Sequence, residues 1–399
     1  MPNPLKNSRV ALGVTGSVAC YKAIDLASKL TQAGALVDVI MTTAATNFLS
    51  PIIFQSITHR PVTTDIFDPK SEMSMDHIAI AKRADVIVVA PTTANTMAKM
   101  AHGLADDALS TTILATKSPV ILAPSMDANM YDNTITQENA KKLTSIGHKI
   151  VGPEEGYLAS GNWGNGRMVS TQEILDHISI VLGSQGDLVN RKITISAGGT
   201  QEPLDPVRVI SNRSSGKMGY AIAKAARDRG ATTVIISAQS SLPDPVGIKV
   251  IKVETALEMK KAIHEECESA DVLIMAAAVS DWRPTKIADH KIKKDVSNTW
   301  TLELTKNPDV LKETTHQGLI KIGFAAESES LQSNAHAKLI SKGLHLIVAN
   351  EITSKDSGFG TDTNKVTLID NEGGVEEFPL MTKYEIGHHI LDRVVTLLK

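Results

Sequence analysis

The sequence predicts two α/β domains in succession, each a parallel, doubly wound sheet covered by helices. The chain has 399 residues, and at about 100 to 200 residues per domain this length favours two domains. Short apolar runs alternate with helical stretches in both halves, which is the order of right-handed β-α-β units. Aromatic residues are scarce, with 6 Phe, 5 Tyr and 3 Trp, so the cores must consist of aliphatic side chains and Met, as in buried parallel sheets.

In the first half, apolar runs bounded by Gly, Pro, Thr or Asn predict buried strands. These runs are residues 10–14, 36–41, 86–90 and 120–123. Between the first two, the spacing of apolar residues over 18–33 predicts a helix that Gly34 terminates. We expect the first domain to occupy residues 1–185.

A polar, glycine-bearing segment, residues 183–192, follows the first domain and is interpreted as a linker. A new series of strands then begins, separated by helices such as 218–229 and 256–268, so the second domain is expected over 190–399. The predicted strands are residues 193–197, 233–238, 248–253, 272–278, 320–324 and 344–349.

The end of the chain differs in character from the parallel units before it. Two short apolar runs, residues 366–369 and 375–378, flank Asp-Asn-Glu-Gly-Gly and predict a β-hairpin. An amphipathic helix is expected over residues 383–398. The second domain is therefore predicted to be Rossmann-like with a C-terminal hairpin.

Charge and cysteine content exclude several classes of protein. Lys plus Arg number 41 and Asp plus Glu 44, a formal charge of −3, so no nucleic-acid-binding surface is expected and any anionic ligand must be held locally. Cys20 and Cys267 lie too far apart in sequence to suggest a disulfide framework or metal cluster, which favours a reducing cytoplasm. The start of the chain lacks an apolar signal core, and no apolar run approaches the roughly 18 residues that span a bilayer.

Two motifs in the first half are candidates for a ligand site. Residues 13–22, GVTGSVACYK, follow the first strand and open a helix, so their amides can face an anion, although a structural turn is an equal interpretation. The motif is not G-x-G-x-x-G, and Thr42 and Thr43 stand where a ribose-binding acid would be expected. This disfavours a nicotinamide oxidoreductase and fits a mononucleotide. Hydroxyl and amide side chains then crowd the carboxyl end of a central strand, more than a helix cap requires, at Thr92, Thr93, Asn95 and Thr96.

The richest stretch of the second half is residues 193–226. Gly198, Gly199 and Thr200 end its strand, and SSGKMG opens a helix, which supplies amides and Lys217 for an anion. It is not a P-loop, because the glycine spacing is absent and Met218 occupies the Ser/Thr position.

A pair of lysines further along the second half is a second candidate. Lys338 and Lys342 share one helical face and could meet a triphosphate. A solvated pair is the alternative interpretation, since isolated lysines usually form an exposed helix face.

Combined, these motifs resemble a known family. Residues 13–22, 77–85, 90–109, 124–131 and 159–168 are similar to the flavin-dependent cysteine decarboxylases. Together with SAGGTQEPLDPVRVISNRSSGKMG, MAAAVSDWRP, KIKK, TKNPDVL, GFAAES and KLISKGLHLIVAN, they resemble the bifunctional coenzyme A biosynthesis proteins, which join phosphopantothenoylcysteine decarboxylase to phosphopantothenate–cysteine ligase. The resemblance covers residues 6–182 and about 191 to the end, and it implies a flavodoxin-like first domain.

For the first half, the resemblance implies an FMN-dependent decarboxylation. FMN oxidises the substrate thiol, carbon dioxide leaves, and the resulting enethiolate is protonated and reduced. The matched His77 is catalytic, and the segment around Asp127 holds the substrate carboxylate beside the flavin. The matched FMN-binding positions are Gly16, Ser17, Val18, Thr42, Thr43, Pro91, Thr92, Thr93, Asn95, Thr96 and Met126.

Two positions depart from the family pattern. Asp127 replaces an Asn, and Ser160 replaces the Cys that donates a proton. A serine is a far poorer acid than a thiol of pKa about 8.5, so Ser160 could only relay a proton from water or His77. An ionised Asp127 at about 4 Å from the substrate carboxylate would cost up to about 4 kcal/mol at an effective dielectric near 20. We therefore expect Asp127 to be protonated or to point elsewhere, in preference to repulsion that assists loss of carbon dioxide.

For the second half, the resemblance implies a CTP-dependent ligation. CTP activates the carboxylate of 4′-phosphopantothenate as an acyl cytidylate, and the amine of cysteine displaces CMP. Asn212 matches the residue that acts on the acyl cytidylate and Lys291 the lysine near the transferring phosphate, while Mg²⁺ is held mainly by CTP. His345 replaces an Asp and is expected to affect strand packing only. The matched CTP-binding positions are Met275, Ala276, Ala277, Asp281, Lys291, Pro308, Asp309, Val310, Leu311, Phe324, Lys338 and Lys342.

The resemblance also implies a homo-oligomer, with trimers of the flavin half and dimers of the ligase half. Decarboxylation of the ligated product gives 4′-phosphopantetheine, so the C-terminal half acts first. The departures at Asp127 and Ser160 motivate an alternative function, an active ligase fused to a flavin-binding module that serves assembly or regulation.

Overall fold

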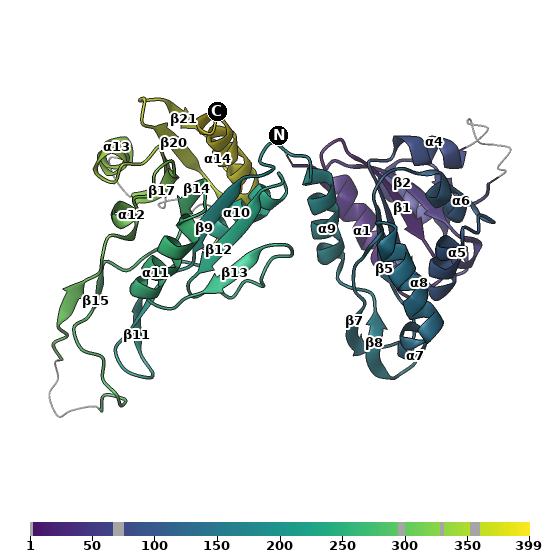
Figure 1. The fold of residues 1–399 in the computed structure, drawn as a ribbon, viewed down its shortest axis with the longest axis horizontal. Coiled ribbons are helices and arrows are strands. Elements are labelled where there is room, and N and C mark those ends of the chain that lie inside the picture. Colours follow the sequence, from purple (N-terminus) through teal and green to yellow (C-terminus); the bar gives the residue numbers. More distant parts are fainter. Residues whose placement is uncertain (1–2, 67–75, 294–299, 328–330, 352–359) are drawn as a thin grey trace. The chain divides into compact units, whose positions relative to one another are not determined.

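The computed structural model describes residues 3–66, 76–293, 300–327, 331–351 and 360–399. These fall into two compact units, Pro4–Leu182 and Gly183–Lys399, called here the N-terminal and C-terminal units (Figure 1). Each unit is an α/β sandwich around its own sheet.

The N-terminal unit contains a parallel sheet in the order β3-β2-β1-β4-β5-β6. Its strands are β1 (Arg9–Val14), β2 (Leu36–Met41), β3 (Val62–Thr63), β4 (Val86–Thr92), β5 (Val120–Pro124) and β6 (Lys149–Ile150). Without the two-residue edge strand β3, this is the flavodoxin order, and with it the full doubly wound order. The predicted flavodoxin-like sheet is confirmed.

Helices cover both faces of this sheet. Alternate residues of β1 point to opposite sides, so Val10 and Leu12 pack in the core under α1, α3 and α9, while Ala11 packs in the core under α4, α5, α6 and α8. Both faces of the sheet are therefore covered by apolar helix residues, as is typical of a parallel sheet. The helices are α1 (Cys20–Gln32), α2 (Thr43–Thr46), α3 (Pro51–Thr58), α4 (Asp76–Arg83), α5 (Ala94–His102), α6 (Ala108–Ala115), α7 (Ala128–Asp132), α8 (Thr134–Ser145) and α9 (Thr171–Gly183).

An antiparallel hairpin, β7 (Glu154–Tyr157) and β8 (Trp163–Arg167), was not expected from the sequence. It lies against the turn between β5 and α7, where the Met126 amide donates to the Gly166 carbonyl at 3.0 Å. A Cβ on Gly166 would lie 2.2 Å from the Met126 carbonyl oxygen, so only glycine permits this approach. The close contact holds β8 against the turn between β5 and α7.

The C-terminal unit repeats the same plan with an antiparallel extension. Its sheet has the order β13-β12-β9-β14-β17-β18-β20-β21. The strands from β13 to β18 pair in parallel, whereas β20 pairs antiparallel with both β18 and β21. The strands are β9 (Lys192–Ala197), β12 (Thr232–Ser237), β13 (Lys249–Lys252), β14 (Val272–Met275), β17 (Ile320–Glu327), β18 (Leu346–Glu351), β20 (Val366–Asp370) and β21 (Val375–Glu377). The Rossmann-like domain with its C-terminal hairpin is thus confirmed.

The strand predicted over residues 272–278 ends three residues early. The apolar run 272–278 continues past β14, which ends at Met275. The Ala277 amide donates to Ser196 Oγ at 3.1 Å and the Ala278 amide to the Gly198 carbonyl at 2.8 Å, so the chain turns here. The residues after Met275 therefore form a loop at the carboxyl edge of the sheet.

Helices of the C-terminal unit also cover both faces. On one side α10 (Lys217–Arg227) and α14 (Lys383–Leu397) pack side by side (Figure 1). The other side carries α11 (Ala256–Cys267), α12 (Val310–Glu313) and α13 (Leu331–Ser341).

Small antiparallel pairs leave the main sheet of the C-terminal unit, and the sequence did not predict them. They are β10 (Gln201–Pro203) with β11 (Val209–Ser211), β15 (Trp282–Pro284) with β16 (Leu304–Lys306), and β19 (Thr363–Asn364) with β22 (Met381–Thr382). The segments around β11 and β15 extend away from the sheet as an arm (Figure 1).

The predicted linker is packed against the C-terminal unit. Leu188 is fully buried, and its amide donates to the Arg229 carbonyl at 3.1 Å. Asp187 accepts from the buried Arg229 guanidinium at 2.6 and 2.8 Å. Polar composition therefore does not make this segment a free tether, because Leu188 and Asp187 are both held by the C-terminal unit.

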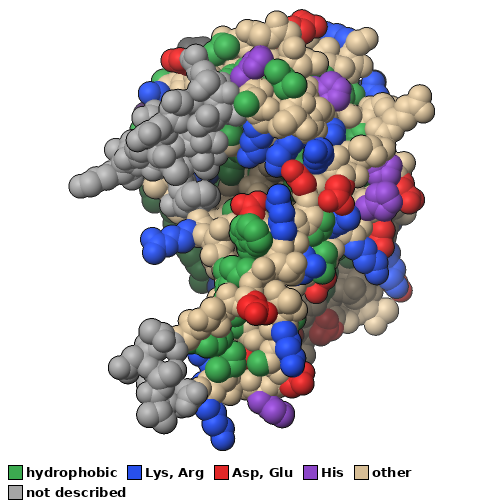
Figure 2. Space-filling model, turned by 90° about the vertical axis from the view of Figure 1, so that its left-hand side faces the viewer, with side chains coloured by type: hydrophobic (Ala, Val, Ile, Leu, Met, Phe, Trp, Pro, Cys, Tyr) green, Lys and Arg blue, Asp and Glu red, His purple; other side chains and the backbone are tan. Residues whose placement is uncertain are grey.

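The surface carries no large field of one sign on the face that Figure 2 shows. Lysine and arginine side chains lie among aspartate and glutamate side chains there. Among the described residues, no helix is long and apolar enough to cross a membrane.

Candidate active sites

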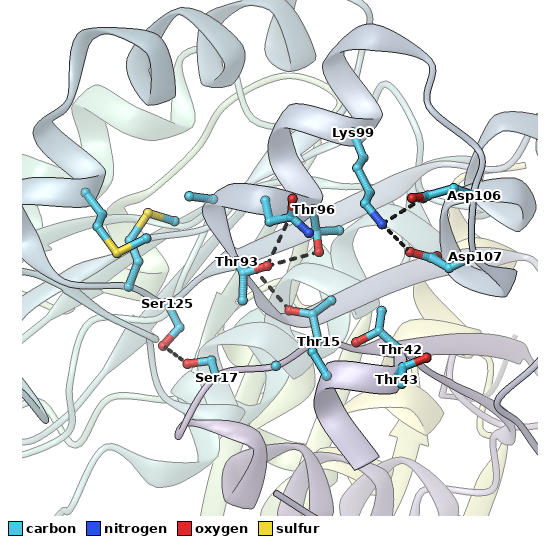
Figure 3. Close-up of a pocket in the computed structure, with 16 residues that line it drawn as sticks. Thr15, Ser17, Thr42, Thr43, Thr93, Thr96, Lys99, Asp106, Asp107 and Ser125 are labelled. Carbon is cyan, nitrogen blue, oxygen red and sulfur yellow. Dashed lines mark hydrogen bonds and ion pairs between the residues drawn. The ribbon is translucent and has the colours of Figure 1, made fainter. Parts of the chain in front are cut away.

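The N-terminal unit has a cavity of about 560 Å³ at the carboxyl ends of β1, β2, β4 and β5. Strand order reverses between β1 and β4, and open α/β sheets bind ligands at such switch points. Figure 3 shows the lining, which is rich in hydroxyl groups.

Thr15, just beyond β1, ties the two central strands together. Its Oγ1 donates to the Pro91 carbonyl at 2.8 Å and accepts from the Thr93 amide at 3.1 Å. These bonds satisfy polar groups that the turn would otherwise leave buried. Thr15 was not predicted, although it directly follows the strand and precedes the glycine turn.

Two lining threonines begin helices. Thr42 caps α2 by accepting from the Ala45 amide, and Thr93 caps α5 by accepting from the Thr96 amide, each at 3.3 Å. Both helices consequently start at the cavity, with their amino ends toward it.

A lysine and two aspartates lie together at one end of the same cavity (Figure 3). Lys99 Nζ lies 2.7 Å from Asp106 and 2.8 Å from Asp107, which also caps α6. Burial lowers the pKa of Lys99, but the hydrogen bonds with the two carboxylates outweigh it and raise the pKa overall. Lys99 is therefore a cation already neutralised by the protein, and the signal that could have found it is the ADD sequence that follows it.

The structure brings most of the predicted mononucleotide residues into this cavity but not all of them. Val18 is exposed, Thr92 turns inward to donate to the Val89 carbonyl at 2.6 Å, and Pro91 gives its carbonyl to Thr15. The Ser17 amide donates to the Thr15 carbonyl at 2.8 Å, so it does not face a ligand as expected. The predicted lining residues are Gly16, Ser17, Thr42, Thr43, Thr93, Asn95, Thr96 and Met126, and those missed are Thr15, Ala44, Ala94, Lys99, Asp106, Asp107, Ser125 and Met130.

The C-terminal unit has a cavity of about 590 Å³ at the equivalent edge of its sheet. The loop after β14, the turn before α12 and the amino end of α10 line it. All the predicted CTP-binding positions except Lys291 lie in this lining, as does Asn212.

Lysines distinguish this second cavity from the first. Lys338 Nζ donates to the Phe324 carbonyl at 2.7 Å, and Lys342 Nζ lies 3.3 Å from Asp309, which caps α12. Lys217 Nζ contacts Asp362 at 2.7 Å. Burial, then repulsion from Lys217, lowers the pKa of Lys383, another lining residue that sequence reasoning missed.

Two families match the two halves of the chain. The family described as Flavoprotein matches residues 1–183, and the one described as DNA/pantothenate metabolism flavoprotein C-terminal domain matches residues 188–398. The coenzyme A biosynthesis bifunctional protein CoaBC of Vibrio cholerae is 42% identical over 391 residues, 97% of this chain and 98% of that protein. The protein of the same name from Bacillus subtilis is 42% identical over 400 residues, 99% of this chain and 98% of its own. This chain belongs to the family of bifunctional coenzyme A biosynthesis proteins.

A solved structure is similar to the ligase side of this family member. The C-terminal domain of a coenzyme A biosynthesis bifunctional protein CoaBC is 35% identical, covers 53% of this chain and 98% of that domain, and has a TM-score of 0.46.

Asp127 and Ser160, the two first-half residues that depart from the family pattern, are hydrogen-bonded to each other. Ser160, on the tip of the β7–β8 hairpin, donates its hydroxyl to Asp127 Oδ2 at 2.7 Å. Asp127 also caps α7, where its Oδ1 accepts from the Asn129 amide at 3.0 Å. The hydrogen bond from Ser160, followed by that from Asn129, lowers the pKa of Asp127, so the free protein carries an ionised aspartate.

Four matched catalytic residues are not among the residues that line the two cavities, namely Asp127, Ser160, His77 and Lys291. His77 is half-buried on α4 and is not part of the lining of the first cavity. Lys291 is exposed in the arm, whose neighbouring Ile292 is held by Asp205 and Arg208. Asn212 does line the second cavity, with its amide donating to the Ala278 carbonyl at 3.2 Å.

His345, the remaining departure, lies at the opposite edge of the sheet from the second cavity. Its Nδ1 accepts the Lys321 amide at 3.1 Å, which extends the pairing of β17 with β18. Burial and then the Lys321 charge lower the pKa of His345, so the ring is a neutral acceptor. Within the described ranges, no cluster of His, Cys, Asp and Glu is arranged to hold a metal ion.

Proposed function

We propose that this protein carries out two consecutive steps of coenzyme A biosynthesis. Residues 190–399 join 4′-phosphopantothenate to cysteine at the expense of CTP, and residues 1–185 then decarboxylate the product to 4′-phosphopantetheine. The similarity over nearly the whole length of both relatives carries this proposal.

For the first step, the cavity of the C-terminal unit supplies the positive charge that CTP needs. Attack by the pantothenate carboxylate on the α-phosphate increases charge on its oxygens, which Lys338, Lys342 and a phosphate-bound Mg²⁺ would stabilise. Asn212, whose amide contacts the loop after β14, would hold the acyl cytidylate while the cysteine amine attacks. Lys291 is proposed to reach the transferring phosphate from the arm.

For the second step, FMN would occupy the cavity of the N-terminal unit. When bound, it supplies the two-electron oxidation and reduction of the substrate. The residues fit a flavin phosphate and ribityl chain, because the lining offers hydroxyls and helix amino ends, and a Cβ on Gly16 would lie 2.5 Å from Ala44 Cβ. Ser125 and Met126 line the cavity, and the residue that follows them, Asp127, would orient the substrate carboxylate.

We further propose a homo-oligomer, with trimers of the N-terminal half and dimers of the C-terminal half. This arrangement is supported by the position of His77 outside the cavity lining, since a neighbouring chain can bring such a residue to the reacting atoms. A cytoplasmic location accords with Cys20 and Cys267 being buried free thiols.

One reaction tests the proposal. The purified protein is given 4′-phosphopantothenate, cysteine, CTP and Mg²⁺, and products are identified by mass spectrometry. We expect 4′-phosphopantetheine, CMP and pyrophosphate. If phosphopantothenoylcysteine accumulates and no 4′-phosphopantetheine forms although FMN is bound, the result would instead support an active ligase fused to an assembly or regulatory module. Absence of CTP turnover would reject both functions.

A further inference from the structure

The hydrogen bond between Asp127 and Ser160 is built into the fold of the N-terminal unit. Asp127 is fixed by its cap on α7, and the hairpin is fixed by the contact of Gly166 with Met126. A Cβ on Gly164 would likewise lie 2.7 Å from Ala128 Cβ. The hairpin therefore lies directly on the segment that bears Asp127, and Ser160 reaches it from the tip.

The two oxygens of Asp127 have different partners. Oδ1 accepts the Asn129 amide, which can only donate, so this oxygen stays an acceptor. Oδ2 faces the Ser160 hydroxyl, which can donate or accept. A proton on Oδ2 would reverse the polarity of this bond without moving a heavy atom, and the Ser160 proton would then be directed to a third group.

Charged residues near Asp127 do not explain its ionisation. The pKa of Asp127 is set by the hydrogen bonds from Ser160 and Asn129. The charged residues on the elements that pack around it are Asp132 on α7, Glu138, Lys141 and Lys142 on α8, and Glu154, Glu155 and Arg167 on the hairpin. None of these is among the groups that shift it, so an incoming substrate carboxylate would be the dominant new charge.

We propose that Asp127 and Ser160 form a proton-delivery pair, in which Asp127 takes up a proton as the substrate carboxylate binds and passes it through Ser160 to the enethiolate. This inference rests on the proposed decarboxylation. It makes the two departures from the family pattern one functional unit, because the serine, a poor acid alone, is recharged by the carboxylic acid behind it.

The proton and electron count closes for this step. Binding of the anionic substrate beside Asp127 draws one proton from solvent onto Oδ2. The substrate thiol is first oxidised to a thiocarbonyl, the two-electron oxidation that bound FMN would supply. The bond from Cα to the carboxylate then breaks, carbon dioxide leaves, and the electron pair of that bond enters the enethiolate. Cα takes the Ser160 proton, Ser160 takes the Asp127 proton, and the enethiolate becomes a neutral thiocarbonyl that awaits reduction. Asp127 ends as the carboxylate with which it began.

The first test measures proton uptake without turnover. The serine analogue of 4′-phosphopantothenoylcysteine, which lacks the thiol, is titrated calorimetrically into the flavin-loaded protein at pH 7 in buffers of different ionisation enthalpy. We expect net proton uptake by the wild type and none by Asp127→Asn. The matched control Asp132→Asn, which removes an exposed acid from the same helix, should behave as the wild type. Binding with equal uptake in wild type and Asp127→Asn would overturn the inference alone.

The second test follows the fate of the enethiolate. In Asp127→Asn and in Ser160→Ala, carbon dioxide should still be released, while formation of 4′-phosphopantetheine falls about 100-fold and the enethiol, two hydrogens lighter, accumulates. The double variant Asp127→Asn/Ser160→Cys should recover product formation, because the thiol donates without an acid behind it.

The outcomes separate the inference from the function on which it rests. Equal loss of carbon dioxide and product in every variant would show a structural role for the pair and overturn the inference. Failure of the wild type to bind the analogue or release carbon dioxide would instead reject the proposed decarboxylation, and the inference with it.

Discussion

The two cavities lie at the same edge of similar sheets yet offer anions different partners. In the N-terminal unit the lining is mostly hydroxyl groups and helix amino ends, and its lysine, Lys99, is matched by two aspartates. In the C-terminal unit several lysines line the cavity, among them Lys217, which contacts Asp362, and Lys342, which contacts Asp309.

This difference follows the chemistry expected in each place. A flavin phosphate does not react, so a neutral cradle is sufficient to hold it. When a triphosphate is attacked, negative charge grows on its oxygens in the transition state. Cations that are already in place stabilise this charge and lower the barrier. The shared topology therefore determines where a ligand binds, and side chains determine what can happen to it.

The largest expected effect is the loss of ligation when Lys291 is replaced. Lys291→Gln should abolish ligation, by about 100-fold or more, because a developing phosphate charge loses its cation. Flavin content should remain that of the wild type. The measurement is pyrophosphate release from CTP, with Lys293→Gln, two residues along the same exposed segment, as the control. An unchanged ligation rate would reject the role given to Lys291.

The corresponding test in the N-terminal unit should weaken flavin binding and leave ligation unchanged. Gly16→Ala places a Cβ 2.5 Å from Ala44 Cβ, so the turn must shift and flavin affinity should fall about tenfold or more. Ligation should be unaffected. Flavin absorbance of the purified protein measures the effect, and adding Ala44→Gly should restore part of it by removing the opposing methyl group. Full flavin content in Gly16→Ala would show that the turn does not hold the cofactor.

The C-terminal unit also contains a buried histidine whose protonation is expected to lower its stability. His388 on α14 is 5% exposed, and neither ring nitrogen has a hydrogen-bond partner within the described part of the chain. Burial, then the Arg229 charge, lowers the pKa of His388 to about 4, against 6.5 ordinarily. The unfolded chain then binds the extra proton first as pH falls, so stability is full above pH about 6.5 and is lost toward pH 4, by about 3 kcal/mol.

Urea unfolding of the whole protein tests this, followed by hydrogen exchange in peptides from α10 and α14. Between pH 7 and pH 4.5 the wild type should lose more stability than His388→Phe, which cannot titrate. His102→Gln, an exposed position in the N-terminal unit, should leave the pH dependence unchanged. Identical pH dependence in wild type and His388→Phe would contradict the prediction.

The smallest effect is expected from Ser160→Cys. A thiol is a better acid than the serine hydroxyl, so decarboxylation should be kept or should rise by a few-fold at most. Single-turnover formation of 4′-phosphopantetheine measures it. Complete loss of activity with bound flavin would mean that position 160 does not face the enethiolate.

The strands and the main motifs were accessible from sequence because their signals are local. Apolar runs bounded by turn residues located β1, β2, β4 and β5 within one or two residues. The error at β14, which ends at Met275, arose because the amides of Ala277 and Ala278 bind Ser196 and Gly198, distant partners that no local pattern reveals.

The sites show the same division. Thr93 and Lys342 stood out because they follow strand ends or share a helical face. Thr15 and Lys99 did not, because Thr15 becomes significant only when β4 lies beside β1, and Lys99 only when its two acids fold back onto it. The exclusion of Val18 and Lys291 from the cavity linings was equally invisible, since exposure is a property of the assembled fold.

By itself the sequence determined the fold class of both halves, the family and the residue types available at each strand end, because periodicity and turn chemistry act over a few residues. Only the tertiary structure decided which of those residues meet. Asp127 and Ser160 are far apart in the chain, and their bond depends on a hairpin held by the Gly166 contact. Such pairings are set by packing between elements, which a linear pattern does not encode.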